Sequence, residues 1–121
     1  MAEHNKLGRE GEAIAVDYLK KKGYAILALN WRYRQYELDI VAQDGNELVI
    51  VEVKSRSVNY LLAPEDAVSN RKIRHIVSGA DAYIKVNDVA LPARFDVMTV
   101  VVGEGKHTIE HIEDAFYSPL F

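Results

Sequence analysis

The sequence predicts an α/β fold in which a mixed central β-sheet is flanked by helices, with the element order α-β-β-β-α-β-β. Two segments place apolar residues at helical spacing, near residues 7–22 and 65–86. Five other segments are short and rich in β-branched or aromatic residues, which is typical of strands. The second helical segment separates two strand segments, and such a long crossover favours a parallel pair. A tight hairpin elsewhere requires an antiparallel pair, so we expect a mixed sheet.

The first helix is expected over residues 7–22, where one side is apolar. Its apolar positions are Leu7, Gly11, Ile14, Ala15, Tyr18 and Leu19. The lysines at 20–22 suit the negative C-terminal end of the helix dipole, and Gly23 suits the stop. Glu10 and Glu12 flank the apolar stripe on its two edges. Either carboxylate could reach a site at the sheet edge, and an ordinary solvent-facing glutamate fits the same pattern.

The segment 37–56, with the sequence ELDIVAQDGNELVIVEVKSR, organises the rest of the chain. It predicts two strands joined by a tight turn at 44–46, since Gly and Asn accept positive φ. The nearly continuous apolar run 48–53 indicates a strand that is buried on both faces. Glu52 and Lys54 interrupt the apolar character and, being two residues apart in a strand, point to the same face.

These two charges mark a candidate site. Asp39, on the neighbouring strand, would lie opposite Glu52 and Lys54 if the hairpin register allows. Charged side chains are costly in a protein interior unless they are paired or bind a metal ion. Two interpretations therefore stand: a structural Glu-Lys pair where the strand leaves the core, or a metal site with a lysine beside it. Carboxylate oxygens are hard ligands that suit Mg²⁺ or Mn²⁺.

The remaining expected elements are, in chain order, a strand at 24–33, a loop at 55–64, a helix at 65–86, a loop at 87–92, a strand at 94–102, a turn at 103–106, an edge strand at 107–112 and a tail at 113–121. Trp31 in the first strand is expected to support the core rather than to stack on a nucleic-acid base. The tail ends in several apolar residues, which we expect to pack on the body of the same domain.

The composition limits the class of protein. A chain of 121 residues suggests one domain and is long enough to bury a core without disulfides. It has no cysteine, which excludes disulfides and thiolate zinc sites. We see no secretion signal and no run near the roughly 18 apolar residues that span a bilayer, so we expect a soluble cytoplasmic protein with no membrane partner. The formal net charge of −3 argues against a protein that simply coats nucleic acid.

Basic residues are nevertheless clustered locally and form candidate nucleic-acid contacts. The candidates are Arg32, Arg34, Arg56, Arg71, Lys72 and Arg74. Because the helical group at 71–74 comes directly after the candidate site, we favour phosphate contact over a merely solvated helix face. Arg56 is a candidate phosphate clamp, and a plain surface arginine fits the same position.

Asp39, a strand-turn-strand and then Glu52-Val53-Lys54 resemble the core of the PD-(D/E)XK nucleases. A wider ordered set resembles the YraN family of small bacterial proteins, which are predicted endonucleases distantly related to archaeal Holliday-junction resolvases. That set consists of Gly11-Glu12, Ala15, Tyr18-Leu19, Asn30-Trp31-Arg32, segments 37–42 and 51–56, and Arg94-Phe95-Asp96. The resemblance spans most of the chain and implies one restriction-endonuclease-like, PD-(D/E)XK nuclease-like domain over residues 1–121.

Single positions can be compared with the family pattern as well. The resemblance selects Glu12 over Glu10, and Lys72 matches a lysine of the family. Gln35-Tyr36 stand where the family more usually has a glycine before the Glu, so the geometry of the turn before Glu37 stays open.

The resemblance implies a metal-dependent endonuclease that hydrolyses phosphodiester bonds in DNA, with branched or structured DNA suggested by the resolvases. Asp39 and Glu52 would bind Mg²⁺ or Mn²⁺ directly, together with the Val53 carbonyl oxygen, and Glu12 would act through water or a second ion. Lys54 would orient the attacking water or stabilise charge on phosphate. Two symmetric incisions would favour a homodimer. The alternative is a non-catalytic nucleic-acid-binding or interaction module that retains the fold.

Overall fold

The computed structural model describes residues 2–58 and 68–117, and its elements follow the expected order. They are α1 (Ala2–Lys21), β1 (Ala25–Tyr33), β2 (Tyr36–Asp44), β3 (Glu47–Ser57), α2 (Asn70–Asn87), β4 (Ala93–Gly103) and β5 (Lys106–Ile112). The predicted α/β class, with its α-β-β-β-α-β-β order and restriction-endonuclease-like arrangement, is confirmed. No helix within the described ranges is both long and apolar enough to cross a membrane.

The sheet is mixed, as the crossover predicted. Its strand order is β1-β2-β3-β4-β5. Three neighbouring pairs are antiparallel, whereas β3 and β4 are parallel and are connected through α2. The parallel pair lies at the centre of the sheet, where Leu48 to Ser57 run beside Ala93 to Val102.

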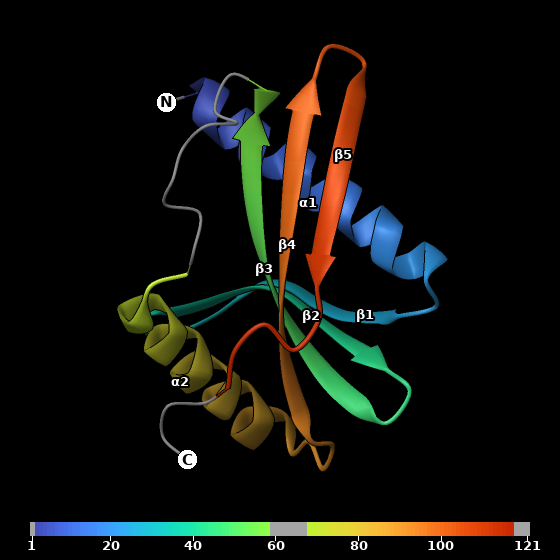
Figure 1. Cartoon of the computed structure of the whole chain (residues 1–121). Coiled ribbons are helices and arrows are strands. Elements are labelled where there is room, and N and C mark those ends of the chain that lie inside the picture. Colours follow the sequence, from blue (N-terminus) through green and yellow to red (C-terminus); the bar gives the residue numbers. More distant parts are fainter. Residues whose placement is uncertain (1, 59–67, 118–121) are drawn as a thin grey trace.

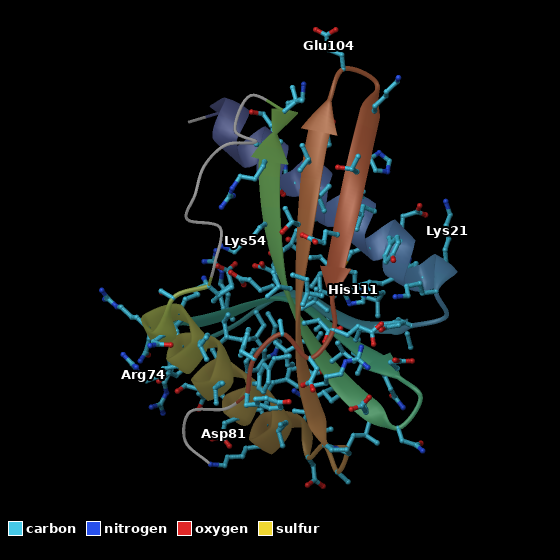
Figure 2. All side chains as sticks on the ribbon, viewed as in Figure 1. Lys21, Lys54, Arg74, Asp81, Glu104 and His111 are labelled. Carbon is cyan, nitrogen blue, oxygen red and sulfur yellow. The ribbon has the colours of Figure 1, made fainter. Side chains whose placement is uncertain are left out.

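The two helices cover opposite faces of the sheet, and β3 is buried between them (Figure 1). Val49 and Val51 pack in the cluster that contains the α1 residues, whereas Leu48 and Ile50 pack in the cluster that contains the α2 residues. All four are at most 2% exposed. The prediction of a strand buried on both faces is therefore confirmed, and the same strand carries Glu52 and Lys54 out of this core. Charged side chains such as Arg74, Asp81 and Glu104 point away from the ribbon (Figure 2).

The expected turns form where residues with positive φ are available. Gly23 has φ +94 directly after α1, and Gly45 has φ +59 in the turn between β2 and β3. The β1-β2 hairpin turns at Arg34-Gln35, although no glycine is present there. Arg34 adopts φ +58 instead, so an arginine takes the left-handed position that a glycine would occupy more readily.

Three predicted boundaries were wrong, and the first is the start of α1, which lies at Ala2 rather than at residue 7. Helix α2 begins at Asn70 rather than at residue 65, because Ser69 is extended and its Oγ accepts the Lys72 N–H at 3.1 Å, which caps the helix. The earlier part of the predicted helix, 65–67, lies outside the described residues. The predicted loop at 55–64 is also wrong at its start, because residues 55–57 continue β3 alongside β4. The rest of that loop, from 59 on, lies outside the described residues.

Trp31 and the tail pack on the α2 side of the sheet. Trp31 meets the Tyr83 ring edge-on, with ring centroids 5.2 Å apart, which confirms its supporting role. Phe116 stacks on Phe95 at 5.2 Å, so the start of the tail packs on the body as expected. Tyr117 is 78% exposed, and residues 118–121 lie outside the described residues.

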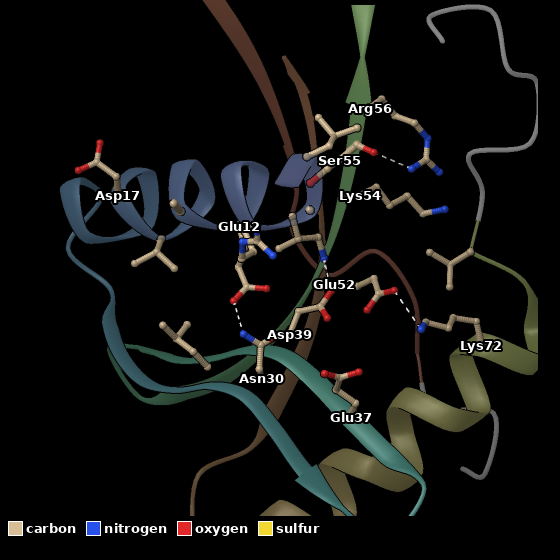
Figure 3. A pocket seen from close by; sticks show the side chains of 18 of the residues that line it. Glu12, Asp17, Asn30, Glu37, Asp39, Glu52, Lys54, Ser55, Arg56 and Lys72 are labelled. Carbon is tan, nitrogen blue, oxygen red and sulfur yellow. Dashed lines mark hydrogen bonds and ion pairs between the residues drawn. The ribbon is translucent and has the colours of Figure 1, made fainter. Parts of the chain in front are cut away.

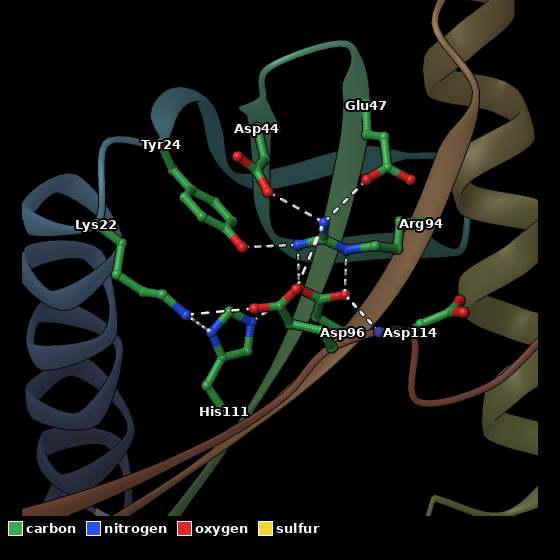
Figure 4. Close-up of polar contacts among 9 residues, drawn as sticks. Lys22, Tyr24, Asp44, Glu47, Arg94, Asp96, His111 and Asp114 are labelled. Carbon is green, nitrogen blue, oxygen red and sulfur yellow. Dashed lines mark hydrogen bonds and ion pairs between the residues drawn. The ribbon is translucent and has the colours of Figure 1, made fainter.

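An ionic network around the buried residues Arg94 and Asp96 joins the start of β4 to the end of β2 and the start of β3 (Figure 4). Asp96 is 0% exposed and accepts two hydrogen bonds from the Arg94 guanidinium, at 2.9 and 2.8 Å. His111 Nε2 lies 2.7 Å from Asp96 Oδ2, and the Asp114 N–H donates to Oδ1 at 3.0 Å. Burial opposes ionisation of Asp96, but these partners outweigh it and lower its pKa to about 2. Arg94 and Asp96 of the family-like set are thus structural residues here.

Candidate active site

The four predicted catalytic side chains line one open cavity of about 1180 Å³. The cavity lies between α1, the first three strands and the start of α2 (Figure 3). Its lining includes Glu12 from α1, Asp39 from β2, and Glu52 and Lys54 from β3. Residues separated by up to 42 positions in the sequence are therefore brought together around one cavity.

Asp39 lies where β2 and β3 separate. The regular pairing of these strands ends at Ile40 and Val51. Asp39 immediately precedes Ile40 in β2, and its side chain replaces the backbone hydrogen bond there, since its Oδ2 accepts the Val53 N–H at 2.9 Å. This bond fixes the Asp39 carboxylate beside Val53. The separation of the strands leaves one side of Glu52 open to the cavity.

Strand β2 also changes the direction of its side chains at this point. Leu38 packs in the α2 cluster, but Ile40, two residues later, packs in the α1 cluster. Residues two apart in a regular strand share a face, so the strand is irregular at Asp39. The irregularity explains how a carboxylate reaches the cavity from a strand whose neighbouring residues are buried.

Glu12 reaches the cavity because α1 approaches β3 closely at Gly11. A Cβ at position 11 would overlap the Ser55 Oγ and lie 2.8 Å from the Ser55 Cβ, so only glycine fits. Glu12 Oε1 accepts a hydrogen bond from Asn30 Nδ2 at 2.7 Å. Burial raises the pKa of Glu12, the Asn30 hydrogen bond opposes this, and nearby carboxylates add to the rise. Glu10 is exposed and does not line the cavity, so Glu12 is the glutamate that reaches it.

Glu52 is the most strongly perturbed carboxylate of the cavity. Its side chain is 14% exposed, and Lys72 Nζ lies 3.4 Å from its Oε2. Burial and the neighbouring Asp39 raise the pKa of Glu52 to about 7, and Lys72 partly offsets them. Lys54 lines the same cavity, but the ammonium at Glu52 Oε2 comes from α2 rather than from β3.

The donor set suits magnesium better than a structural transition metal. Among the described residues, no group of three or more His, Cys, Asp or Glu side chains forms a ready metal cage. Two carboxylates, Asp39 and Glu52, lie beside the Val53 backbone in an open cavity. Mg²⁺ typically takes one or two carboxylates and keeps several waters, so these residues fit it. Burial and the neighbouring Asp39 raise the pKa of Glu52, and a bound cation would offset both effects.

The predicted nucleic-acid contacts fall into two groups. Half of them line the cavity, namely Arg32, Arg56 and Lys72. The other half do not, namely Arg34, Arg71 and Arg74. Of these, the last two are exposed on α2, whereas Arg34 lines a second cavity of about 1120 Å³ between α2 and the C-terminal segment.

Several cavity residues were not among the predicted site residues, and two of them, Asn30 and Glu37, interact with predicted site residues. Glu37 is a second carboxylate, besides Asp39, that lies near Glu12, and it forms an ion pair with Arg32 at 3.2 Å. Asn30 supplies an amide donor. Both residues belong to the family-like set of the sequence, but the strand register that places Asn30 opposite Asp39 appears only in the structure.

Comparison with known proteins places the chain in a family. The model of "Uncharacterised protein family UPF0102" matches residues 11–100. The chain is 53% identical to a UPF0102 protein of Parabacteroides distasonis over 119 residues, covering 98% of each chain. It is 53% identical to one of Bacteroides thetaiotaomicron over 121 residues, all of both chains, and 48% identical to one of Flavobacterium psychrophilum over 117 residues, covering 97% and 98%. The chain therefore belongs to the UPF0102 family, which confirms the YraN-like resemblance at the level of the family.

Proposed function

We propose that this protein is a metal-dependent endonuclease of the PD-(D/E)XK type that hydrolyses phosphodiester bonds in DNA. One observation carries the proposal: Asp39, Glu52 and Lys54 come together in one open cavity, with Asp39 held by the Val53 N–H. A purely structural Glu-Lys pair within β3 is less consistent with this geometry, because the ammonium at Glu52 Oε2 belongs to Lys72.

Each residue has a role that its position allows. Asp39, Glu52 and the Val53 carbonyl oxygen would hold Mg²⁺ or Mn²⁺, with Glu12 acting through water or a second ion. A divalent ion bound there supplies positive charge for the phosphate and lowers the pKa of bound water. Lys54 reaches the same cavity and would orient the attacking water or stabilise charge on the phosphate.

The basic residues that line the cavity support a polyanionic substrate. Arg56 and Lys72 lie on the side formed by β3 and α2, and Arg32 lies on the side formed by β1. Lys72 Nζ is 3.4 Å from Glu52 Oε2, so a divalent ion bound by Glu52 would displace Lys72 and release it for phosphate. The exposed Arg71 and Arg74 extend the basic surface along α2. Branched DNA is the substrate shape that the resolvase resemblance suggests.

A cleavage panel tests the proposal. Labelled duplex, single strand, flap and four-way junction would be incubated with Mg²⁺ and with Mn²⁺, using wild type, Lys54→Ala and Glu52→Ala purified identically. We expect cleavage by wild type only, with the preferred substrate revealing the DNA shape. Equal cleavage by all three proteins would refute the site. Tight binding of DNA without cleavage would favour a non-catalytic nucleic-acid-binding module instead.

A further inference from the structure

Asn30 has an unusual backbone conformation for a residue within a strand. It belongs to β1, yet its φ is +50, in the left-handed region that L residues rarely adopt and that asparagine tolerates better than most. Strained backbone of this kind persists where the surrounding structure holds it, and it is concentrated at functional sites. The side chain of Asn30 is therefore a candidate for a role in the site.

Asn30 lies directly across from the candidate site in the strand register. Leu29 pairs with Ile40 and Trp31 pairs with Leu38, so Asn30 stands opposite Asp39. Strand β2 is irregular at that same position, where the face of its side chains changes. The irregularities of the two strands thus coincide, and both place a polar side chain in the cavity.

The Asn30 amide contacts one of the proposed ion-binding carboxylates. Its Nδ2 donates to Glu12 Oε1 at 2.7 Å, and the two side chains come from β1 and α1 (Figure 3). Glu12 experiences repulsion from Asp39 and Glu37 in the same cavity. A carboxylate on a long side chain, repelled by its neighbours, would turn toward solvent unless a donor held it. Asn30 is such a donor, fixed by its own strand.

We propose that Asn30 is a positioning residue that holds Glu12 toward Asp39 and so completes the divalent-ion site. This inference rests on the proposed nuclease site and assigns no direct contact between Asn30 and the ion. Groups that orient metal ligands typically change metal affinity by about 10- to 100-fold when they are removed.

A double-mutant cycle on Mn²⁺ affinity tests the role. Asn30→Gly removes the amide but suits φ +50, so the hairpin keeps its backbone. Asp88→Gly is the matched control, since Asp88 also has positive φ, +52, but caps α2 away from the cavity lining. The Mn²⁺ dissociation constant would be measured for wild type, both glycine variants, Glu12→Ala and the Asn30→Gly/Glu12→Ala double variant. Thermal melts would verify that each variant folds.

We expect Asn30→Gly to weaken Mn²⁺ binding by about tenfold, Asp88→Gly to leave it unchanged, and Asn30→Gly to have no further effect once Glu12 is alanine. Unchanged affinity in Asn30→Gly, or the same loss with and without Glu12, would overturn the role. DNA cleavage by the same proteins separates the two claims. If the Mn²⁺ affinities follow the expected cycle but wild type cleaves no DNA, the role of Asn30 is supported and the nuclease activity is refuted. If wild type binds no Mn²⁺, both proposals are overturned.

Discussion

The close approach of α1 to β3 at Gly11 can be tested by adding one methyl group. In Gly11→Ala the new Cβ would overlap the Ser55 Oγ and lie 2.8 Å from the Ser55 Cβ. The hydroxyl can rotate away, but the Cβ cannot, so α1 must shift from the sheet. Overpacking of this kind costs about 1–3 kcal/mol. Replacing glycine by alanine inside a helix also stabilises the helix by about 1 kcal/mol, which partly offsets the destabilisation from overpacking.

Gly8→Ala separates these two effects. Gly8 lies in the same helix and is exposed, and a methyl group added there would meet no atom within 4 Å. Gly8→Ala therefore shows only the stabilisation that alanine gives a helix over glycine. Thermal and urea unfolding of the two variants should therefore differ by about 1–3 kcal/mol, with Gly8→Ala above wild type. At about 4 °C per kcal/mol, the melting temperatures should differ by roughly 4–12 °C.

Ser55→Gly provides the rescue, because it removes both atoms that the new methyl group meets and leaves the Ser55 Cα at 3.6 Å. The Gly11→Ala/Ser55→Gly double variant should recover the overlap cost as a coupling energy of about 1–3 kcal/mol. If Gly11→Ala is as stable as Gly8→Ala, or if Ser55→Gly rescues nothing, the helix does not depend on this contact. Glu12 would then need another explanation for its place in the cavity.

Three further predictions concern charge. Asp96→Asn breaks a buried ion pair and should lower the free energy of unfolding in urea by about 3–5 kcal/mol. Asp81→Asn is the exposed control, because the Asp81–Lys85 ion pair also has a short contact of 2.9 Å, and it should lower that free energy by under about 1 kcal/mol. Similar losses in the two variants would refute the role of burial. The pKa of Glu52 is raised from 4.5 to about 7, so between these pH values the folded state binds a proton that the unfolded state has released. The metal-free protein should therefore lose up to about 3 kcal/mol of stability as the pH rises from 4.5 to 7. Glu52→Gln should abolish this pH dependence of stability, and a dependence that persists in the variant would contradict the assignment to Glu52. Lys72→Met removes the cation beside Glu52 and should move the Glu52 titration, followed by carboxyl NMR, to higher pH; no movement would show that the pair does not form in solution.

Much of the fold followed from local patterns in the sequence. The run at 48–51 has no polar residue, and the strand is indeed covered on both faces. Gly23 and Gly45 ended their elements where expected, because each position needs positive φ. The order of elements then required a parallel pair across α2, which the sheet contains.

What the sequence left open depends on contacts between distant segments. Periodicity does not report register, so it could not place Asn30 opposite Asp39 or reveal that Lys72 pairs with Glu52. The start of α2 depended on a single side chain, Ser69, whose cap is visible only once the backbone is known. Glu12 was distinguished from Glu10 by resemblance, and the physical reason, the close contact at Gly11, appears only in three dimensions.

The location of a bound Mn²⁺ ion tests the proposed site most directly. Crystals soaked in Mn²⁺ would be measured by anomalous diffraction above and below the manganese absorption edge, with and without DNA. We predict one principal peak bounded by Asp39, Glu52 and the Val53 carbonyl oxygen, at metal–oxygen distances of about 2 Å, with Lys72 moved away from Glu52. A principal peak elsewhere, or Glu52 still paired with Lys72 and no peak between the carboxylates in the DNA complex, would contradict the metal site.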